Sequence, residues 1–183
     1  MASELTVQTL RGPTSGANAD TVLIPSGQTL DASNGFVAPT GHVIQTIYGE
    51  SGSATSTLST NFVSTGLVKP ITTKMANSKI LVVYDFCVQM NLNNGGTSEV
   101  SIFNSLDNYA TKLISKASAT YDNHWVMTPN GLQILHAPNQ SAGTTITYDL
   151  RMRKTSGSSS MYIIDNWNGS SAKQTVVIME IAQ

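Results

Sequence analysis

The sequence predicts an all-β protein: an antiparallel, jelly-roll-like β-sandwich preceded by a short extended N-terminal β arm. Apolar and polar residues alternate along three segments, and a period of two places one face of a strand against a core and the other against water. Even positions are apolar along Lys79–Met90, and even positions also form the expected core row of Thr144–Arg153. Along Gln174–Ile181 the odd positions Thr175, Val177, Met179 and Ile181 are expected to form the apolar, core-facing side.

Shorter β-patterned segments and turn signals fill the rest of the chain after residue 41. Turns are expected at Asn93–Gly96, Pro129–Gly131 and Ser156–Ser160, which are rich in Gly, Asn, Pro and Ser. The order in which the strands pair is not readable from the sequence. The further strands that we expect are His42–Tyr48, Asn61–Thr72, Ser98–Leu106, Lys112–Ser115, Trp125–Met127, Gly131–His136 and Met161–Asp165.

The composition is low in charge, at 11% charged residues against a usual value of about 25%. The net charge of −1 gives no electrostatic reason to expect nucleic acid or an anionic membrane as a partner. No apolar run approaches the roughly 20 residues of a membrane-spanning helix, so membrane insertion is not expected. The start, Met1–Glu4, lacks the pattern of a secretory signal, so we expect synthesis in a cytoplasm.

The first forty residues differ from the rest of the chain. Leu5–Val7 and Val22–Ile24 are short extended pieces with too few apolar residues to bury a core of their own. A loosely attached tail is one alternative, and a segment that orders only against other copies or a larger assembly is the other. We therefore expect two domains: an N-terminal docking and trimerisation arm over residues 1–40, and a β-sandwich head over residues 41–183.

Catalytic and metal-binding motifs are not apparent in the sequence, and we expect a protein that is not an enzyme and needs no cofactor or metal. His42, His124 and His136 fall in different segments without metal-ligand spacing, although a trimer could gather three copies of one histidine at its axis. Cys87 is expected to be a small, inert residue of a strand. Isolated aspartates could pair in three dimensions for glycoside cleavage, but no spacing points to such a pair.

Two short segments combine the side chains that bind sugars. Aromatic rings offer flat apolar faces, and neighbouring amide, carboxylate and imidazole groups can bond hydroxyls. The alternative for both tryptophans is packing, at the ends of the sandwich or between subunits. The candidate ligand-binding residues are Tyr121, Asp122, Asn123, His124, Trp125 and Trp167.

Six segments spread over nearly the whole chain carry a family resemblance: Ser3–Leu10, Asp20–Asp31, Gly41–Thr46, Asn77–Val82, Thr144–Leu150 and Val176–Ile181. In them the chain resembles the short tail-fibre and fibre-tip proteins of bacteriophages, particularly cyanobacterial and marine phages, and Asp20–Asp31 resembles a rung of a triple β-helix. The resemblance implies a homotrimer, a virion location and attachment to the host surface. The chain is short for a whole fibre, so a receptor-binding tip, a head fibre and a structural piece of capsid or tail all stay open.

Three functions follow as hypotheses. The first is a phage fibre or adhesin that binds a host-surface polysaccharide, with residues 1–40 docked on another virion protein. The second is a structural capsid-decorating, head-fibre or tail subunit without a ligand of its own. The third is a polysaccharide-degrading spike. The position of the protein in the virion separates the first two.

Overall fold

The computed structural model describes the backbone of residues 14–16, 26, 38–51, 54–90, 96–120, 126–157, 160–163, 166–167, 170–171 and 173–183. Side chains are described for these residues except 90, 118–120, 126–128, 166–167 and 170–171. Residues 38–183 form one compact unit. The arm predicted over residues 1–40 lies largely outside the described residues, so its role stays a prediction.

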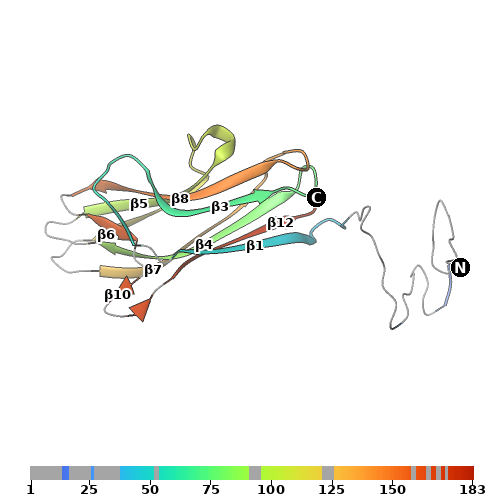
Figure 1. Ribbon diagram of the computed structural model, residues 1–183, viewed down its shortest axis with the longest axis horizontal. Coiled ribbons are helices and arrows are strands. Elements are labelled where there is room, and N and C mark those ends of the chain that lie inside the picture. Colours follow the sequence, from blue (N-terminus) through green and yellow to red (C-terminus); the bar gives the residue numbers. More distant parts are fainter. Residues whose placement is uncertain are drawn as a thin grey trace, which may run out of the picture. The chain divides into compact units, whose positions relative to one another are not determined.

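Two antiparallel sheets pack face to face as a sandwich, and Figure 1 shows the two layers. The long strands of the first sheet lie in the order β1 (Val43–Ser51), β12 (Gln174–Ile181), β4 (Lys79–Met90) and β7 (Val126–His136). Those of the second sheet lie in the order β3 (Val63–Thr72), β8 (Thr145–Ser156), β5 (Gly96–Asn104) and β6 (Ile114–Thr120).

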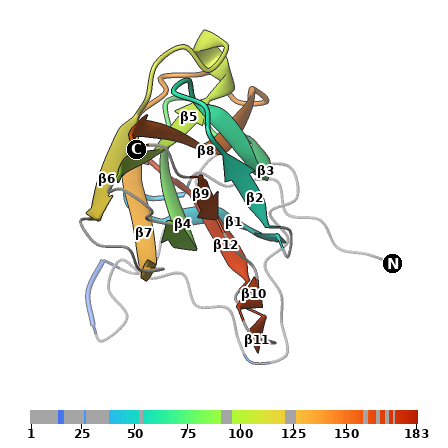
Figure 2. The ribbon, with the colours of Figure 1, turned by 90° about the vertical axis from the view of Figure 1, so that its left-hand side faces the viewer.

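Short elements complete the architecture. β9 (Met161–Ile163) pairs with the last residues of β4, and β2 (Thr55–Thr57) pairs with β9, so both extend the first sheet (Figure 2). β10 (Asn166–Trp167) and β11 (Ser170–Ser171) form a small hairpin in the β8–β12 connection. A single 3₁₀ turn, η1 (Ser105–Asp107), follows β5.

The strand order is that of a jelly roll. Ranked along the chain, the eight long strands occupy positions 1-8-3-6 in the first sheet and 2-7-4-5 in the second. Every connection between consecutive long strands crosses from one sheet to the other, except the β5–β6 connection. Two interleaved four-stranded antiparallel sheets of this order define the jelly-roll sandwich, which confirms the predicted fold class.

The core forms between the inner faces of the two sheets, as the alternation predicts for two of the three segments. On β4, Ile80, Val82 and Tyr84 are fully buried, and on β8 the even residues from Ile146 to Met152 are fully buried. The Tyr84 hydroxyl donates to the Leu67 carbonyl at 3.3 Å, so the one polar atom of this core side chain is bonded. Burial raises the pKa of Tyr84, which stays neutral.

The third segment faces the other way from the prediction. On β12 the even residues Gln174, Val176, Ile178 and Glu180 are buried, and the odd residues lie on the outer face. The register sets this parity: Val176 lies opposite Tyr84 and Ile178 opposite Val82, and directly opposed residues share a face of the sheet. Both faces of β12 carry apolar residues, and the outer face carries more of them because Gln174 and Glu180 lie on the inner one, so the pattern alone indicated the wrong face.

The expected turn at Pro129–Gly131 is also wrong. β7 runs through it without interruption, with Pro129 opposite Cys87 and Gly131 opposite Asp85 on β4. Among the described residues β7 has β4 as its sheet partner, so it is an edge strand, where proline is tolerated because no ladder bond from its nitrogen is needed.

Candidate functional site

The two ends of the sandwich carry different parts of the chain. At one end, here called the arm end, the Gly41 amide donates to the Ala182 carbonyl and the Ala182 amide donates to the His42 carbonyl, both at 2.9 Å. The described chain therefore enters the head beside its C-terminus, as Figure 1 shows. β4 starts at the arm end with Lys79 and runs 12 residues to Met90, a length of about 37 Å.

At the opposite end, here called the loop end, several connections meet. Met90 of β4 lies opposite Val126 of β7 and Met161 of β9. Gly96 of β5 lies opposite Thr120 of β6. The loop end thus receives the β4–β5 and β6–β7 connections and the start of the long β8–β12 connection.

The candidate ligand-binding residues belong to two of these connections. Tyr121, Asp122, Asn123, His124 and Trp125 join Thr120 to Val126, and all five lie outside the described residues. Trp167 pairs through its backbone with Ser170 in the β10–β11 hairpin, and its side chain is outside the described part. The topology assigns the first segment to a connection at the loop end and the second to the β8–β12 connection, which starts there. The roles of both as ligand contacts or packing residues stay predictions.

A cluster that the sequence did not predict covers the outer face of the second sheet. Glu99 and Asp149 are only 7% and 3% exposed, although both lie on the face turned away from the core. Three aromatic rings and two guanidinium groups cover them. We call this set the arginine–aromatic cluster, and its members are Phe62, Glu99, Phe103, Tyr109, Asp149, Arg151 and Arg153.

Aromatic rings lie over both arginines of the cluster. The guanidinium carbon of Arg153 lies 4.5 Å from the ring centre of Phe62, and that of Arg151 lies 4.4 Å from the ring centre of Tyr109. Phe62 in turn packs edge-on against Phe103, with ring centres 4.9 Å apart. These distances fall within the range of cation–π contacts, which are stronger where the cation is partly desolvated.

Each arginine of the cluster also bonds a carboxylate. Arg153 donates from Nε and Nη2 to Glu99 Oε2 at 2.9 and 2.6 Å, and Lys112 bonds the other oxygen of Glu99. Burial disfavours the charged form of Glu99, but the bonds from Lys112, Arg153 and Ser115 outweigh burial and lower its pKa to about 2. Glu99 is therefore a fixed anion near neutral pH.

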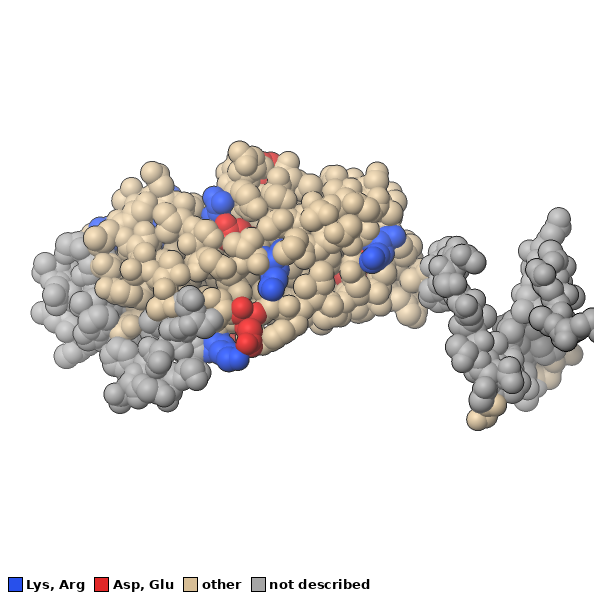
Figure 3. All heavy atoms as spheres, viewed as in Figure 1, with Lys and Arg blue, Asp and Glu red and all other residues tan. Residues whose placement is uncertain are grey.

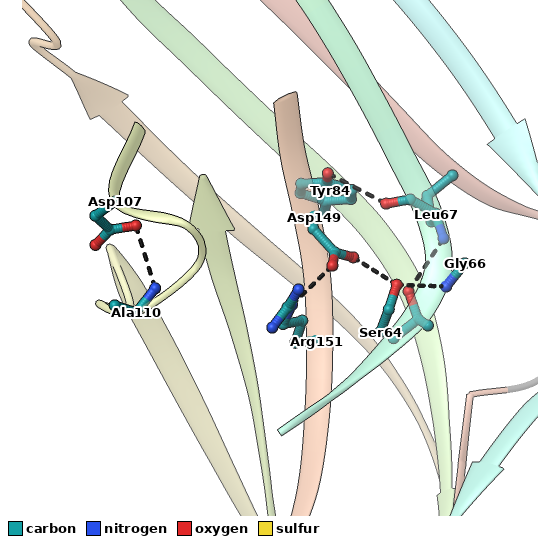
Figure 4. A network of polar contacts seen from close by, with 9 residues as sticks. Ser64, Gly66, Leu67, Tyr84, Asp107, Ala110, Asp149 and Arg151 are labelled. Carbon is teal, nitrogen blue, oxygen red and sulfur yellow. Dashed lines mark hydrogen bonds and ion pairs between the residues drawn. The ribbon is translucent and has the colours of Figure 1, made fainter. Parts of the chain in front are cut away.

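Asp149 joins the cluster to β3. It accepts from Arg151 Nε and from the Ser64 hydroxyl, each at 2.7 Å, and Figure 4 shows these two groups pointing at its carboxylate from opposite sides. Ser64 also accepts from the Gly66 amide at 3.1 Å, where β3 is irregular. The network holds the β3 edge against β8 through side chains where the strand pairing is interrupted.

The arginine–aromatic cluster therefore acts as a second, polar packing layer. Both of its carboxylates are paired with basic groups. Ser101, fully buried on the same face, has a hydroxyl oxygen without a hydrogen-bond partner. Within the described ranges no three metal-ligating side chains come together.

The described histidines serve the fold. His42 Nδ1 lies 3.1 Å from the Pro39 carbonyl at the arm end, and His136 Nδ1 lies 2.8 Å from the Tyr148 hydroxyl. Burial lowers the pKa of His136, so its neutral form is favoured. His124 lies outside the described residues. Cys87 is half-buried, and burial followed by the neighbouring Asp85 charge raises the pKa of its thiol, which suits the inert role expected of it.

The outer face of the first sheet is apolar, because β12 turns its odd residues outward. In one row Tyr48, Val177 and Val83 lie side by side on β1, β12 and β4, with Gln133 next on β7. In the next row Met179, Leu81 and Leu135 do so on β12, β4 and β7, with Thr46 next on β1. We call this surface the apolar face, and its members are Val43, Tyr48, Leu81, Val83, Leu135, Val177, Met179 and Ile181.

Charge is sparse over the molecule as a whole. Figure 3 shows Lys, Arg, Asp and Glu as small separate spots on the side that it presents. In the described part of the chain, no helix is long and apolar enough to cross a bilayer.

Comparisons with known proteins identify no family. No protein-family model matches the sequence, and no curated protein matches it. Among solved structures, a chain from infectious bursal disease virus Gx strain overlays with 16% identity and a TM-score of 0.38, covering 86% of this chain and 42% of that one. A chain of the VP2 subviral particle of the same virus overlays with 14% identity and a TM-score of 0.33, covering 93% and 46%.

This chain spans less than half the length of the solved chains that it matches. A third structure, from the Gt strain of that virus, overlays with 15% identity and a TM-score of 0.34 over 87% of this chain and 43% of that one. Likenesses with TM-scores this low carry no conclusion about function. The jelly-roll assignment rests on the strand order of the chain itself.

Proposed function

We propose that this chain is a non-enzymatic virion protein that attaches a phage particle to a host-surface polysaccharide. It acts as a homotrimer, made in the host cytoplasm. Residues 1–40 dock on another virion protein, and residues 41–183 carry the loop end away from the particle. The sequence resemblance to phage short tail fibres and the jelly-roll sandwich both favour this assignment over a soluble enzyme.

The observation that carries the proposal is the separation of the two ends. The arm joins the head at Gly41, bonded to Ala182, while the β6–β7 connection with Trp125 belongs to the loop end. Along β4 these ends are about 37 Å apart. A protein that docks by its N-terminus and binds by its loops needs this polarity.

The candidate residues at the loop end have the chemistry for a weak glycan site. Tyr121, Trp125 and Trp167 can stack on the apolar side of a sugar ring, and Asp122, Asn123 and His124 can bond its hydroxyls. Three copies on one trimer raise the avidity through effective concentration. The described buried carboxylates are bonded within the fold, Glu99 and Asp149 by basic partners and Glu180 by backbone amides and the Ser78 hydroxyl, which favours binding over cleavage.

Deletion of residues 1–40 tests the polarity. Phage particles are produced from a genome in which the gene for this protein lacks the codons for residues 1–40. The amount of truncated protein in the purified particles is compared with the amount of full-length protein in unaltered particles. We expect incorporation to be lost while the recombinant chain from Gly41 keeps its β circular dichroism and melts cooperatively. Normal incorporation of the truncated protein would reverse the polarity.

A structural role without a ligand is the second candidate. The apolar face favours this role, because an apolar surface suits permanent packing against other virion subunits and not only against copies within a trimer. A glycan array probed with the full chain separates the two. Binding that disappears with Trp125→Ala supports attachment, and absence of binding to any glycan or host cell supports the structural subunit.

A further inference from the structure

We infer that the apolar face is the interface between copies of this chain. This inference names the subunit contact of the proposed homotrimer and rests on that proposal. The contacting surface is the outer face of the β1-β12-β4-β7 sheet, and the partner is a second copy packed with its arm end beside the first.

The exposure of this face is unusual for a protein that works alone. Tyr48 and Leu135 are 57% and 52% exposed, and they lie at opposite sides of the face on the edge strands β1 and β7. Between them lie Leu81, Val177 and Met179, which are half-buried. Isolated apolar residues are common on protein surfaces, but a continuous patch across four strands marks a contact surface.

The size and polarity of the face suit a subunit interface. The eight positions of the face, about 4.8 Å apart between strands and about 6.8 Å apart along a strand, cover about 260 Å² in projection. This is the apolar centre of a small contact, since each partner of a standard interface gives roughly 800 Å² including its polar rim. Polar residues bound the rows: Lys79 on one side, and Glu50, Thr175 and Asp85 on the other. An apolar centre with a polar rim is the usual anatomy of such contacts.

A hollow in the same sheet has the size for one side chain. It measures about 260 Å³ and lies at Gly131, whose missing side chain leaves space beside Val83 and Gln133. Small-molecule sites occupy about 300–1,000 Å³, so this hollow is small for a ligand. A large side chain of a neighbouring copy would fill it.

Continuity with the arm identifies the occupant as a second copy. The row formed by Val43 and Ile181 is next to Gly41 and Ala182, where the chain leaves the head. Copies packed in parallel through the apolar face therefore bring their Gly41 residues to the same end of the assembly. A trimerisation arm needs its starting points to lie together in this way.

Charge placed on the face tests the interface in the full chain. Leu135→Glu and Val177→Glu would bury unpaired carboxylates, and we expect the dissociation constant of the trimer to rise at least about 100-fold. Sedimentation velocity at micromolar protein should then show monomers. Leu106→Glu is the matched control. Leu106 is 41% exposed in η1, which follows β5 and is no part of the apolar face, so its variant should stay trimeric.

Circular dichroism melting shows whether each variant is folded. If a glutamate variant fails to fold, Leu135→Thr and Val83→Thr are used instead. Threonine is polar but well suited to a β-strand. Trimers that persist in all folded face variants would overturn the interface and leave the homotrimer standing. A monomeric unaltered chain would overturn both. A dimer that the face variants dissociate would support the interface and overturn the three-fold arrangement.

Discussion

Leu81 and Met179 lie directly opposite each other on β4 and β12, with both side chains on the outer face of the first sheet. Leu135 of β7 extends the same row. The pair shows that β12 presents one apolar row to the core and a second apolar row to the surroundings. The outward row is the basis of the inferred contact between copies.

The first prediction compares neighbouring residues of β12. Ile178 is fully buried, so Ile178→Ala should lower the free energy of unfolding by about 2–4 kcal/mol. Met179→Ala should cost less than about 1 kcal/mol, because its side chain is outside the core. Both substitutions are compared by urea denaturation in the Leu135→Glu background. The inferred subunit contact is absent there, so the measurement reports the free energy of unfolding of the head alone. A larger loss for Met179→Ala than for Ile178→Ala would contradict the register.

The second prediction concerns acid. The folded-state pKa of Glu99, about 2, lies below the ordinary value of about 4.3, so its ion pairs stabilise the fold above that ordinary value. That stability is lost as the pH falls from about 5 to 2. We expect a share of about 1–2 kcal/mol, because solvent around the exposed Lys112 weakens the pairs.

Urea denaturation at several pH values measures the contribution of the Glu99 ion pairs, as the difference in the free energy of unfolding between the unaltered chain and its variants. Glu99→Gln should show a shallower loss of stability between pH 5 and 2 than the unaltered chain. Glu50→Gln is the control. Bonds from Lys173 and Tyr48 lower the pKa of Glu50 too, but solvent screens this exposed pair, so the slope should change much less than for Glu99→Gln. Equal pH slopes for Glu99→Gln and the unaltered chain would show that the cluster leaves Glu99 unperturbed.

The third prediction concerns Glu180, a buried carboxylate near the arm end. It accepts from the Lys74 and Met75 amides and from the Ser78 hydroxyl, at 2.7 to 3.0 Å. Burial opposes its ionisation, but these bonds and one from Gln45 lower its pKa. Glu180→Gln keeps the size but loses an acceptor, and should cost about 2–3 kcal/mol in thermal or urea unfolding. A cost below about 0.5 kcal/mol would mean that water replaces these bonds.

The fourth prediction concerns the loop-end tryptophans. If they contact glycan, Trp125→Ala and Trp167→Ala should abolish binding to host cells with little change in the melting temperature. Packing residues would instead lower that temperature by several degrees for each 1–2 kcal/mol lost. Binding that survives both substitutions in a still-folded trimer would show that the site lies elsewhere.

Much of the fold could be predicted from local alternation. The bounds of Lys79–Met90 and Gln174–Ile181 match β4 and β12, and the inner row of β8 is as expected. The inner face of β12 could not be predicted, because buried Gln174 and Glu180 make it the more polar of the two rows and only pairing with β4 decides between them. Pro129–Gly131 reads as a turn locally, and only its place on an edge strand makes it part of β7.

The arginine–aromatic cluster could not be predicted for the same reason. Arg151 and Arg153 were expected on the outward side of their strand, and they are there. Their aromatic partners Phe62 and Tyr109 come from distant segments, and only the pairing of β8 with β3 and β5 brings them together. The candidate glycan residues are predicted from their chemistry alone. The topology places one segment in the β6–β7 connection and the other in the β8–β12 connection.

The position of the chain in the particle separates attachment to the host from a structural role in the capsid. A cryo-electron reconstruction of the virion, fitted with the head over residues 41–183, would show it. We expect a three-fold projection on the tail, with Gly41 and the arm against the particle, the apolar faces turned toward one another, and the loop end outermost. A head set in the capsid lattice, or one whose loop end points into the particle, would contradict attachment as the function.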